Sequence, residues 1–307
     1  MGRLTALRLF TIWAFLVAAC GVDSQSAVAQ EAAAKADASA DKSSEKGAKA
    51  PEFVRILRDG KKPLALQTAV VKYQKPGVID GPEVTLIGAV HIGEAEYYSG
   101  LNQLFRGYDG LLFEMVMDPG MEVPDPEERG VSPVSTIQTG MKDTLGLTFQ
   151  LDEIDYKAKN FIHADMTPTE FMETMKKREE GLVNMMLRSI GAGLAMQSTG
   201  QSSGDIDLLA AMVSGDREMA MRRAFAEQME TMDGQMAALT GKDGKSTLIT
   251  ERNAKAFEVM DRELEAGKKK LGIFYGAGHL KDMHKRLVEE YGMVPAETTW
   301  KSAWNLK

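Results

Sequence analysis

Cysteine is the scarcest residue of this chain, because Cys20 is the only one among 307 residues. A single cysteine excludes an intramolecular disulfide and a cysteine-rich structural zinc site. The chain also lacks the His-Glu-x-x-His pattern of zinc peptidases, so we do not expect a hydrolase of that class.

An excess of positive charge is absent as well. Lys and Arg number 37 against 44 Asp and Glu, and the formal net charge is -7. Without a basic patch, nucleic acid is not an expected partner. The length and the hydrophobic share of 44% are sufficient for one large folded core.

The N-terminal apolar stretch is short. It runs over eleven residues, from Leu9 to Ala19, and a bilayer-spanning helix needs about 20. It follows two arginines and ends in "LVAAC", so residues 1–20 resemble a signal peptide with a lipobox in which Cys20 becomes lipidated. A second cleavage site at residues 27–29 leaves a soluble form open. The sequence predicts export, either as a membrane-anchored lipoprotein of the cell envelope or as a soluble periplasmic protein.

Residues 21–50 contain almost no large apolar side chains, which predicts a flexible tether. The remainder, residues 51–307, reads as one α/β domain. Strands are predicted at 64–73, 83–91, 111–116 and 269–279, and at 298–306. Helices are predicted at 95–108, 247–264 and 280–292. This order indicates a mixed, largely parallel sheet with flanking helices.

A helical insertion is predicted at 168–240, and it begins with the capping sequence Thr167-Pro168-Thr169-Glu170. Eleven of the twenty methionines lie in this insertion. Methionine fills irregular gaps in a core, and it also suits an adaptable lid or groove over a binding site. Both interpretations remain open.

Two of the four histidines have the same setting, a Gly-x-x-His at the end of an apolar run. These are His91 in "GAVH" and His279 in "GAGH". Glu114 lies in the apolar stretch "LLFEMV", where a buried carboxylate requires a partner. Ligands bind beyond the carboxyl ends of strands in α/β sheets, so we expect these three side chains to converge there.

Two imidazoles and a carboxylate can bind a divalent metal such as Mn, Co or Zn, or they can act as a base with its orienting partners. The candidate metal ligands are His91, Glu114 and His279. His163, Asp165 and Asn253 are secondary candidates for a second part of the site or for its orienting shell. Each of these residues also has an ordinary alternative, a local hydrogen bond or a surface position.

These motifs resemble the TraB/PrgY/Tiki family, within a wider erythromycin-esterase-like and ChaN-like superfamily. The resemblance rests on "GAVHIGEAEYYSGLNQLFRGYDGLLFEMV", on "ERN" at 251–253 and on "GIFYGAGHL", and it covers roughly residues 64–295. It implies that His91, Glu114, Arg252 and His279 are catalytic. Members of the superfamily are described as metal-dependent proteases, as proteins that block peptide pheromones, as lactone hydrolases with a histidine base, and as haem binders.

Two functions follow as hypotheses. The first is a hydrolase, above all a metal-dependent peptidase of the cell envelope, in which Arg252 steadies the developing oxyanion and the substrate is a peptide or protein. The second is a non-catalytic binder that sequesters a peptide or a haem-like ligand. A hydrolase requires His91, Glu114 and His279 within one small pocket, whereas a binder tolerates their separation. The third interpretation is a purely structural envelope protein, in which the histidines have no catalytic or binding role.

Overall fold

The computed structural model describes residues 51–121, 123, 144–180, 211, 214–238 and 244–307. The predicted signal peptide, the lipidation site Cys20 and the predicted tether lie outside the described residues, as does part of the predicted helical insertion.

The centre of the molecule is a seven-stranded sheet with the strand order β1-β2-β3-β8-β5-β7, and β9 also pairs with β2. The strands are β1 Val54–Asp59, β2 Lys62–Gln74, β3 Glu83–Ala89, β5 Gly110–Phe113, β7 Phe161–His163, β8 Lys270–Gly276 and β9 Val294–Asn305. Strands β3, β8, β5 and β7 are parallel, whereas β1, β3 and β9 pair with β2 in the antiparallel sense. The predicted α/β fold with a mixed, largely parallel sheet is confirmed.

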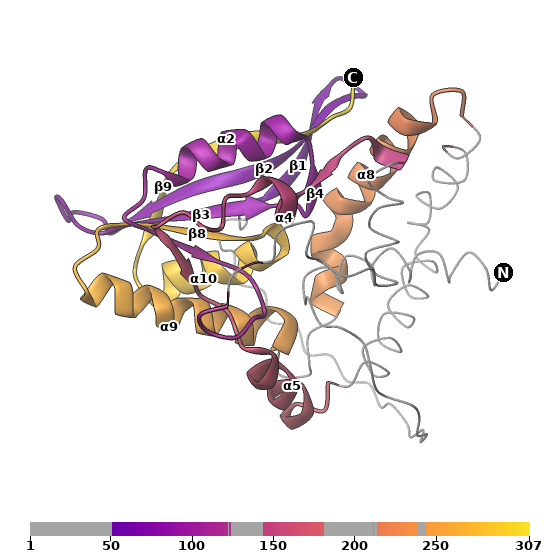
Figure 1. Ribbon diagram of the computed structural model, residues 1–307. Helices are drawn as coiled ribbons and strands as arrows, with labels where there is room; N and C mark the ends of the chain where they lie inside the picture. The colour runs from indigo at the N-terminus through magenta and orange to yellow at the C-terminus, as the bar shows by residue number, and fades with distance from the viewer. Residues whose placement is uncertain (1–50, 122, 124–143, 181–210, 212–213, 239–243) are drawn as a thin grey trace, which may run out of the picture.

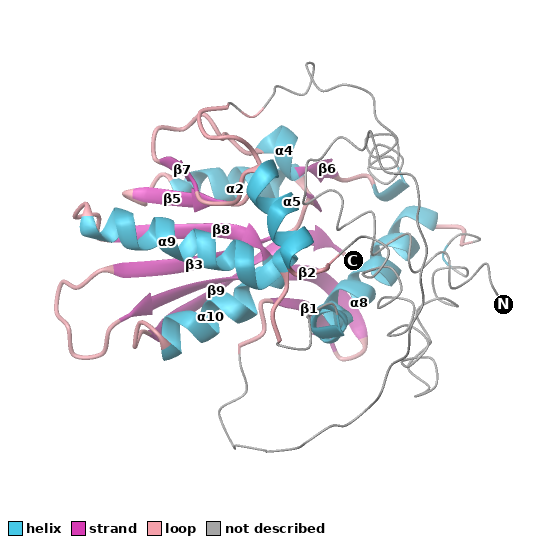
Figure 2. Ribbon diagram, turned by 90° about the horizontal axis from the view of Figure 1, so that it is seen from below, coloured by secondary structure: helices cyan, strands magenta, loops and turns pink. Residues whose placement is uncertain are grey.

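Helices cover both faces of this sheet (Figures 1 and 2). Helix α2 (Ala95–Phe105) packs on one face, where Leu101 and Phe105 join a buried cluster with Phe274 of β8. Helices α9 (Arg252–Glu265) and α10 (Leu280–Glu289) pack on the other face, where Met260 and Leu287 join a second cluster. Because successive strand residues point to opposite faces, β8 contributes to both clusters.

Three short elements were not predicted, and they lie next to the candidate site. Strands β4 (Ile92–Gly93) and β6 (Thr148–Phe149) form a separate antiparallel pair. Helix α4 (Gln150–Glu153) follows β6 directly. Elements of two to four residues have too few side chains for a recognisable hydrophobic period, so sequence patterns do not reveal them.

The described parts of the predicted insertion are largely helical. Helix α5 (Pro168–Lys177) begins with the expected capping box: Thr167 accepts from the backbone of Glu170, whose side chain accepts from the backbone of Thr167. Helix α8 (Arg217–Ala238) lies further along the chain. Helix α5 packs against the π-helical turn η2 (Thr247–Glu251) that precedes α9. Residues 181–210 lie outside the described part.

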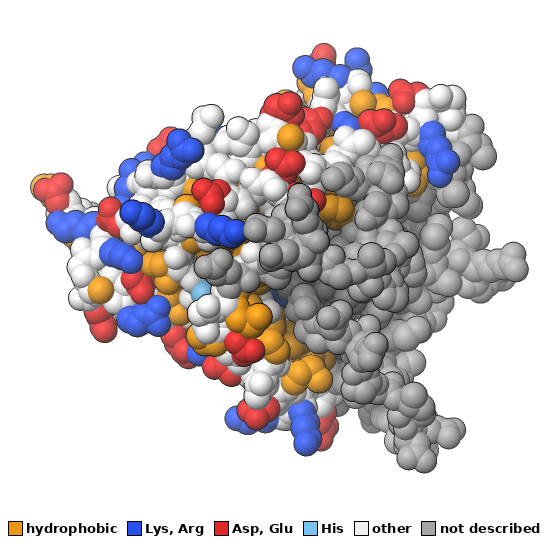
Figure 3. Space-filling view, in the orientation of Figure 1, with side chains coloured by type: hydrophobic (Ala, Val, Ile, Leu, Met, Phe, Trp, Pro, Cys, Tyr) orange, Lys and Arg blue, Asp and Glu red, His pale blue; other side chains and the backbone are white. Residues whose placement is uncertain are grey.

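Within the described residues, the helices are either too short or too polar to cross a membrane. On the face drawn in Figure 3, basic and acidic side chains lie interspersed rather than gathered by sign.

The capping box of α5 gives a first prediction. Replacing Thr167 by Ala removes the side-chain acceptor for an N-terminal amide, so we expect the free energy of unfolding to fall by about 1 kcal/mol. The matched control is Thr169→Ala, an exposed residue in the first turn of the same helix, which is expected to change it by less than about 0.5 kcal/mol. Urea unfolding measures both. Equal effects of the two substitutions would contradict the role of the cap.

Candidate active site

Four neighbouring strands end at one edge of the sheet, and each is followed by a predicted site residue. His91 comes two residues after β3, Glu114 directly after β5, and Asp165 two residues after β7. His279 ends the 3-10 turn Ala277–His279 that follows β8. Because these strands are parallel neighbours, their carboxyl ends meet, and the four side chains are placed at one end of the sheet.

Gly276 is the point around which three of these side chains gather. A Cβ atom at Gly276 would lie 3.2 Å from Oε2 of Glu114, 3.8 Å from Cδ2 of His279 and 3.9 Å from Nε2 of His91. The backbone N–H of Gly276 donates to Glu114 Oε2 at 2.7 Å. Glycine allows this close approach, because a larger residue would displace the carboxylate by a few tenths of an ångström. The two Gly-x-x-His motifs and Glu114 thus meet in one small site.

Arg252 links the site to its supporting shell. Its Nε and Nη2 donate to the two carboxylate oxygens of Asp165 at 2.9 and 2.5 Å, and Nη2 also donates to Glu114 Oε1 at 2.8 Å. The Arg252 side chain is 1% exposed. The π-helical turn η2 delivers it to this place at the start of α9. Breaks of this kind in helical geometry are often found at functional sites.

Glu114 is ionised despite its burial. Burial alone would raise its pKa, but the interactions with His279 and Arg252, and to a lesser extent with His91, outweigh this effect and hold the pKa of Glu114 well below its usual range. The buried carboxylate that appeared anomalous in the sequence therefore has its partners. It lies 3.4 Å from Nε2 of His279 and so presents negative charge to the imidazole.

His279 is oriented by Asn253. The side-chain amide of Asn253 donates to the carbonyl of His279 at 3.1 Å and to Asp282 Oδ2 at 2.9 Å. These two acceptors fix which end of the amide carries the NH2 group, so Asn253 Oδ1 is the atom that faces His279 Nδ1 at 2.7 Å. Because this oxygen can only accept, Nδ1 carries the proton. Asn253, a secondary candidate in the sequence, thus fixes the orientation of the His279 ring.

His91 is the half-buried member of the site. Burial lowers its pKa most; Glu114 raises it, and the charges of Arg252 and His279 lower it further, so the pKa of His91 lies below its ordinary value. The imidazole is consequently neutral at pH 7 and able to accept a proton. The backbone carbonyl of His91 accepts from the N–H of Gln150 at 2.9 Å, which ties the His91 loop to α4.

Gln150 is a site residue that sequence reasoning missed. Its side chain is 7% exposed, and its Nε2 donates to the hydroxyl of Tyr156 at 2.8 Å. Its Oε1 is buried without a hydrogen-bond partner of good geometry, yet it lies near enough to His91 to favour the protonated imidazole and raise the pKa of His91 slightly. A lone glutamine outside any motif gives no sequence signal of this role.

His163 and Asp165 do not share a role. Asp165 is part of the buried pair with Arg252, which matches the orienting role considered for it. His163 faces a different neighbourhood, where its Nε2 lies 2.6 Å from the carbonyl oxygen of Met115 and its ring packs on Phe113. The structure therefore places His163 beside the site rather than with Glu114.

The expected metal ligands do not fit a divalent ion as they are placed. Within the residues that the structure describes, no three His, Cys, Asp or Glu side chains are arranged to share a metal. The physical reason is that both Glu114 oxygens already accept hydrogen bonds, one from Arg252 and one from Gly276. A guanidinium at 2.8 Å also repels a second cation from the same carboxylate. The arrangement suits proton transfer better than coordination of Mn, Co or Zn.

Comparisons with known proteins add no further assignment, because this chain matches no protein-family model, no curated protein and no solved structure. The resemblance to the TraB/PrgY/Tiki family therefore stays a prediction from the motifs.

The buried charge pair gives a stability prediction. Replacing Arg252 by Met leaves Asp165 and Glu114 buried and uncompensated, so we expect a loss of about 3–5 kcal/mol in the free energy of unfolding. The control is Arg262→Met on the same helix, whose side chain is 62% exposed; its loss should stay below about 1 kcal/mol. Urea unfolding of both variants tests this. Similar losses of unfolding free energy in the two variants would show that the buried ion pairs of Arg252 do not stabilise the fold more than an exposed arginine does.

Proposed function

We propose that this protein is a hydrolase that cleaves a peptide or ester bond with His91 as the general base. The observation that carries the proposal is the convergence of a neutral, half-buried imidazole with a buried, ionised carboxylate around Gly276. By the distance criterion set out from the sequence, a hydrolase needs His91, Glu114 and His279 in one pocket, and their close placement supports it. The peptide bond is the first candidate because of the family resemblance.

In the proposed reaction, His91 takes a proton from a water molecule while the water oxygen forms a bond to the substrate carbonyl carbon. The bond from that carbon to the leaving nitrogen or oxygen then breaks, and the imidazolium of His91 returns the proton to the leaving atom. Each step is balanced without a further reactant. His91 suits this role because its lowered pKa leaves the imidazole neutral at pH 7, the form that a base requires.

Glu114 stabilises the imidazolium that forms on His91, since its negative charge raises the pKa of that histidine. Asn253 orients His279, whose Nε2 lies 3.4 Å from Glu114 Oε1, the oxygen that also accepts from Arg252. The oxyanion role expected for Arg252 is not supported by its placement, because the guanidinium is buried against Asp165 and Glu114. Instead, we propose that Arg252 orients the Glu114 carboxylate.

The base assignment predicts a specific loss of turnover. In a screen of quenched peptides and p-nitrophenyl esters, His91→Gln should lower kcat/KM by about 10²–10⁴-fold without unfolding the protein. The control is His284→Gln, because His284 bonds to the hydroxyl of Tyr73 at 2.8 Å and takes no part in the site. That variant should keep its activity. Full activity in His91→Gln, or equal losses in the two variants, would reject His91 as the base.

The pH profile gives a second, independent test of the same base. Burial lowers the pKa of His91 below its ordinary value of 6.5. The imidazole therefore stays mostly neutral while the pH falls from 7 to 6.5. The activity should therefore be level near pH 7 and should decline with a midpoint below pH 6.5. A decline centred above pH 7 would contradict this assignment. Binding of peptides without turnover at any pH would favour the sequestering protein instead.

We also propose that the protein is exported and attached to the membrane through lipid on Cys20. Support comes from the sequence alone, from the N-terminal arginines, the eleven-residue apolar stretch and the small residues before Cys20. A lipid anchor would hold the hydrolase at the cell envelope on the flexible segment that we predict for residues 21–50.

This proposal predicts that the full chain incorporates labelled palmitate when a bacterial host expresses it, and that it sediments with membranes. Cys20→Ser should lose both the label and the sedimentation, because the modified thiol is gone. Sequencing the mature N-terminus is the control for cleavage. A mature protein that begins after residue 29 and carries no label would instead show the soluble periplasmic form.

A further inference from the structure

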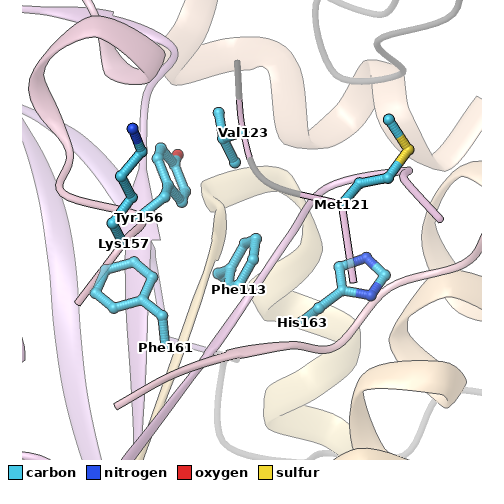
Figure 4. Close-up of a pocket in the computed structure, with 7 residues that line it drawn as sticks. All are labelled: Phe113, Met121, Val123, Tyr156, Lys157, Phe161 and His163. Atoms are coloured by element: carbon cyan, nitrogen blue, oxygen red, sulfur yellow. The ribbon is translucent and has the colours of Figure 1, made fainter. Parts of the chain in front are cut away.

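A hollow of about 300 Å³ lies at the ends of β5 and β7, where Phe113 and His163 line it (Figure 4). Its wall is formed mainly by aromatic and apolar side chains, with one lysine and one histidine. The lining residues are Phe113, Met121, Val123, Tyr156, Lys157, Phe161 and His163. Its volume is at the lower limit of small-molecule sites, about 300–1,000 Å³, and so suits one side chain better than a large macrocycle.

The wall of the hollow is a packed aromatic cluster. The ring centroids of Phe113 and Tyr156 are 5.4 Å apart, and those of Tyr156 and Phe161 are 5.7 Å apart at an interplanar angle of 75°. Phe113 also contacts His163 edge-on, with centroids 5.7 Å apart. Tyr156 and Phe161 remain half-buried. A further ring entering the hollow would extend the same edge-to-face packing, which aromatic groups prefer.

The hollow is linked to His91 by a chain of hydrogen bonds. Phe113 forms part of its wall, and although Glu114 is the next residue, the two side chains point to opposite faces of the sheet. On the other side, the Tyr156 hydroxyl accepts from the side chain of Gln150, whose backbone N–H donates to the carbonyl of His91. A group bound in the hollow is therefore positioned relative to the His91 loop through Tyr156 and Gln150.

We propose that this hollow is a specificity pocket for an aromatic side chain of a peptide substrate. This inference rests on the hydrolase function proposed above, and it names the residue class that the enzyme selects next to the bond it cleaves. Phe161 and Tyr156 contact the substrate ring, and Tyr156 is tied to the His91 loop through Gln150. The pocket favours Phe, Tyr or Trp because burying a ring removes more apolar surface from water than burying a methyl group.

The test measures binding separately from turnover. Saturation-transfer NMR titrations of the full chain use N-acetylphenylalaninamide and N-acetylalaninamide as probes. The phenylalanine probe should bind at least about tenfold more tightly, as expected from burial of one ring. Phe161→Ala should remove most of this preference. Equal affinity of the two probes for the wild-type protein would overturn the proposal.

A matched pair of methionine variants guards against a general loss of structure, since Phe161 also packs against Phe105. Met121 lines the hollow and is 59% exposed, whereas Met172 lies on α5 outside the lining and is 57% exposed. Met121→Trp should narrow the hollow and weaken binding of the phenylalanine probe. Met172→Trp should leave it unchanged. Equal behaviour of these two variants would also overturn the proposal.

Hydrolysis of matched peptides, with Phe or Ala at each position in turn, distinguishes this inference from the proposed function. Turnover without any aromatic preference would refute the pocket and leave the hydrolase standing. Selective binding of the aromatic probe without turnover of any peptide or ester would refute the hydrolase and retain the pocket as a binding site for aromatic side chains.

Discussion

The site depends on the ion pairs that the buried guanidinium of Arg252 forms with Asp165 and Glu114. A charge in this environment is tolerable only with full compensation, and Asp165 and Glu114 provide it from the ends of two parallel strands. In return the guanidinium fixes α9 against those strand ends and sets the direction of the Glu114 carboxylate. Glu114 then determines the electrostatic setting of both His91 and His279. Three separated segments of the chain, α9 and the ends of β5 and β7, are thereby held in one arrangement by a single cation.

Part of this arrangement could be read from the sequence because its signals are local. Apolar runs ending in Gly-x-x-His predicted β3 and β8, and Glu114 was recognisable as a carboxylate inside an apolar stretch. The partner of Arg252 was not predictable, because Asp165 lies 87 positions away and the pairing exists only when β7 and α9 meet. The contribution of Gln150 was hidden for a related reason. It depends on the pairing of β4 with β6, and strands of two residues are too short to show a periodic sequence pattern.

The same residues support two kinds of chemistry in principle, and their hydrogen bonds decide between them. A metal site needs carboxylate lone pairs that are available for coordination. Here one oxygen of Glu114 accepts from Arg252 and the other accepts from the N–H of Gly276. Coordination through the remaining lone pairs of this carboxylate would place a divalent ion beside the guanidinium of Arg252, which repels it. Acceptance and release of a proton by an adjacent imidazole does not bring a divalent cation against that guanidinium.

His91 differs from its neighbours because it can gain and lose a proton without leaving another buried charge unpaired. The carboxylates of Glu114 and Asp165 and the guanidinium of Arg252 compensate one another, so changing any one of them would strand a buried charge. His91 is half-buried, neutral at pH 7 and close to an ionised carboxylate that stabilises its protonated form. Burial and Arg252 lower the pKa of His91 and so prevent the protonated form from predominating at pH 7. A group balanced in this way can alternate between two charge states while the rest of the site stays fixed, which is the requirement for a general base.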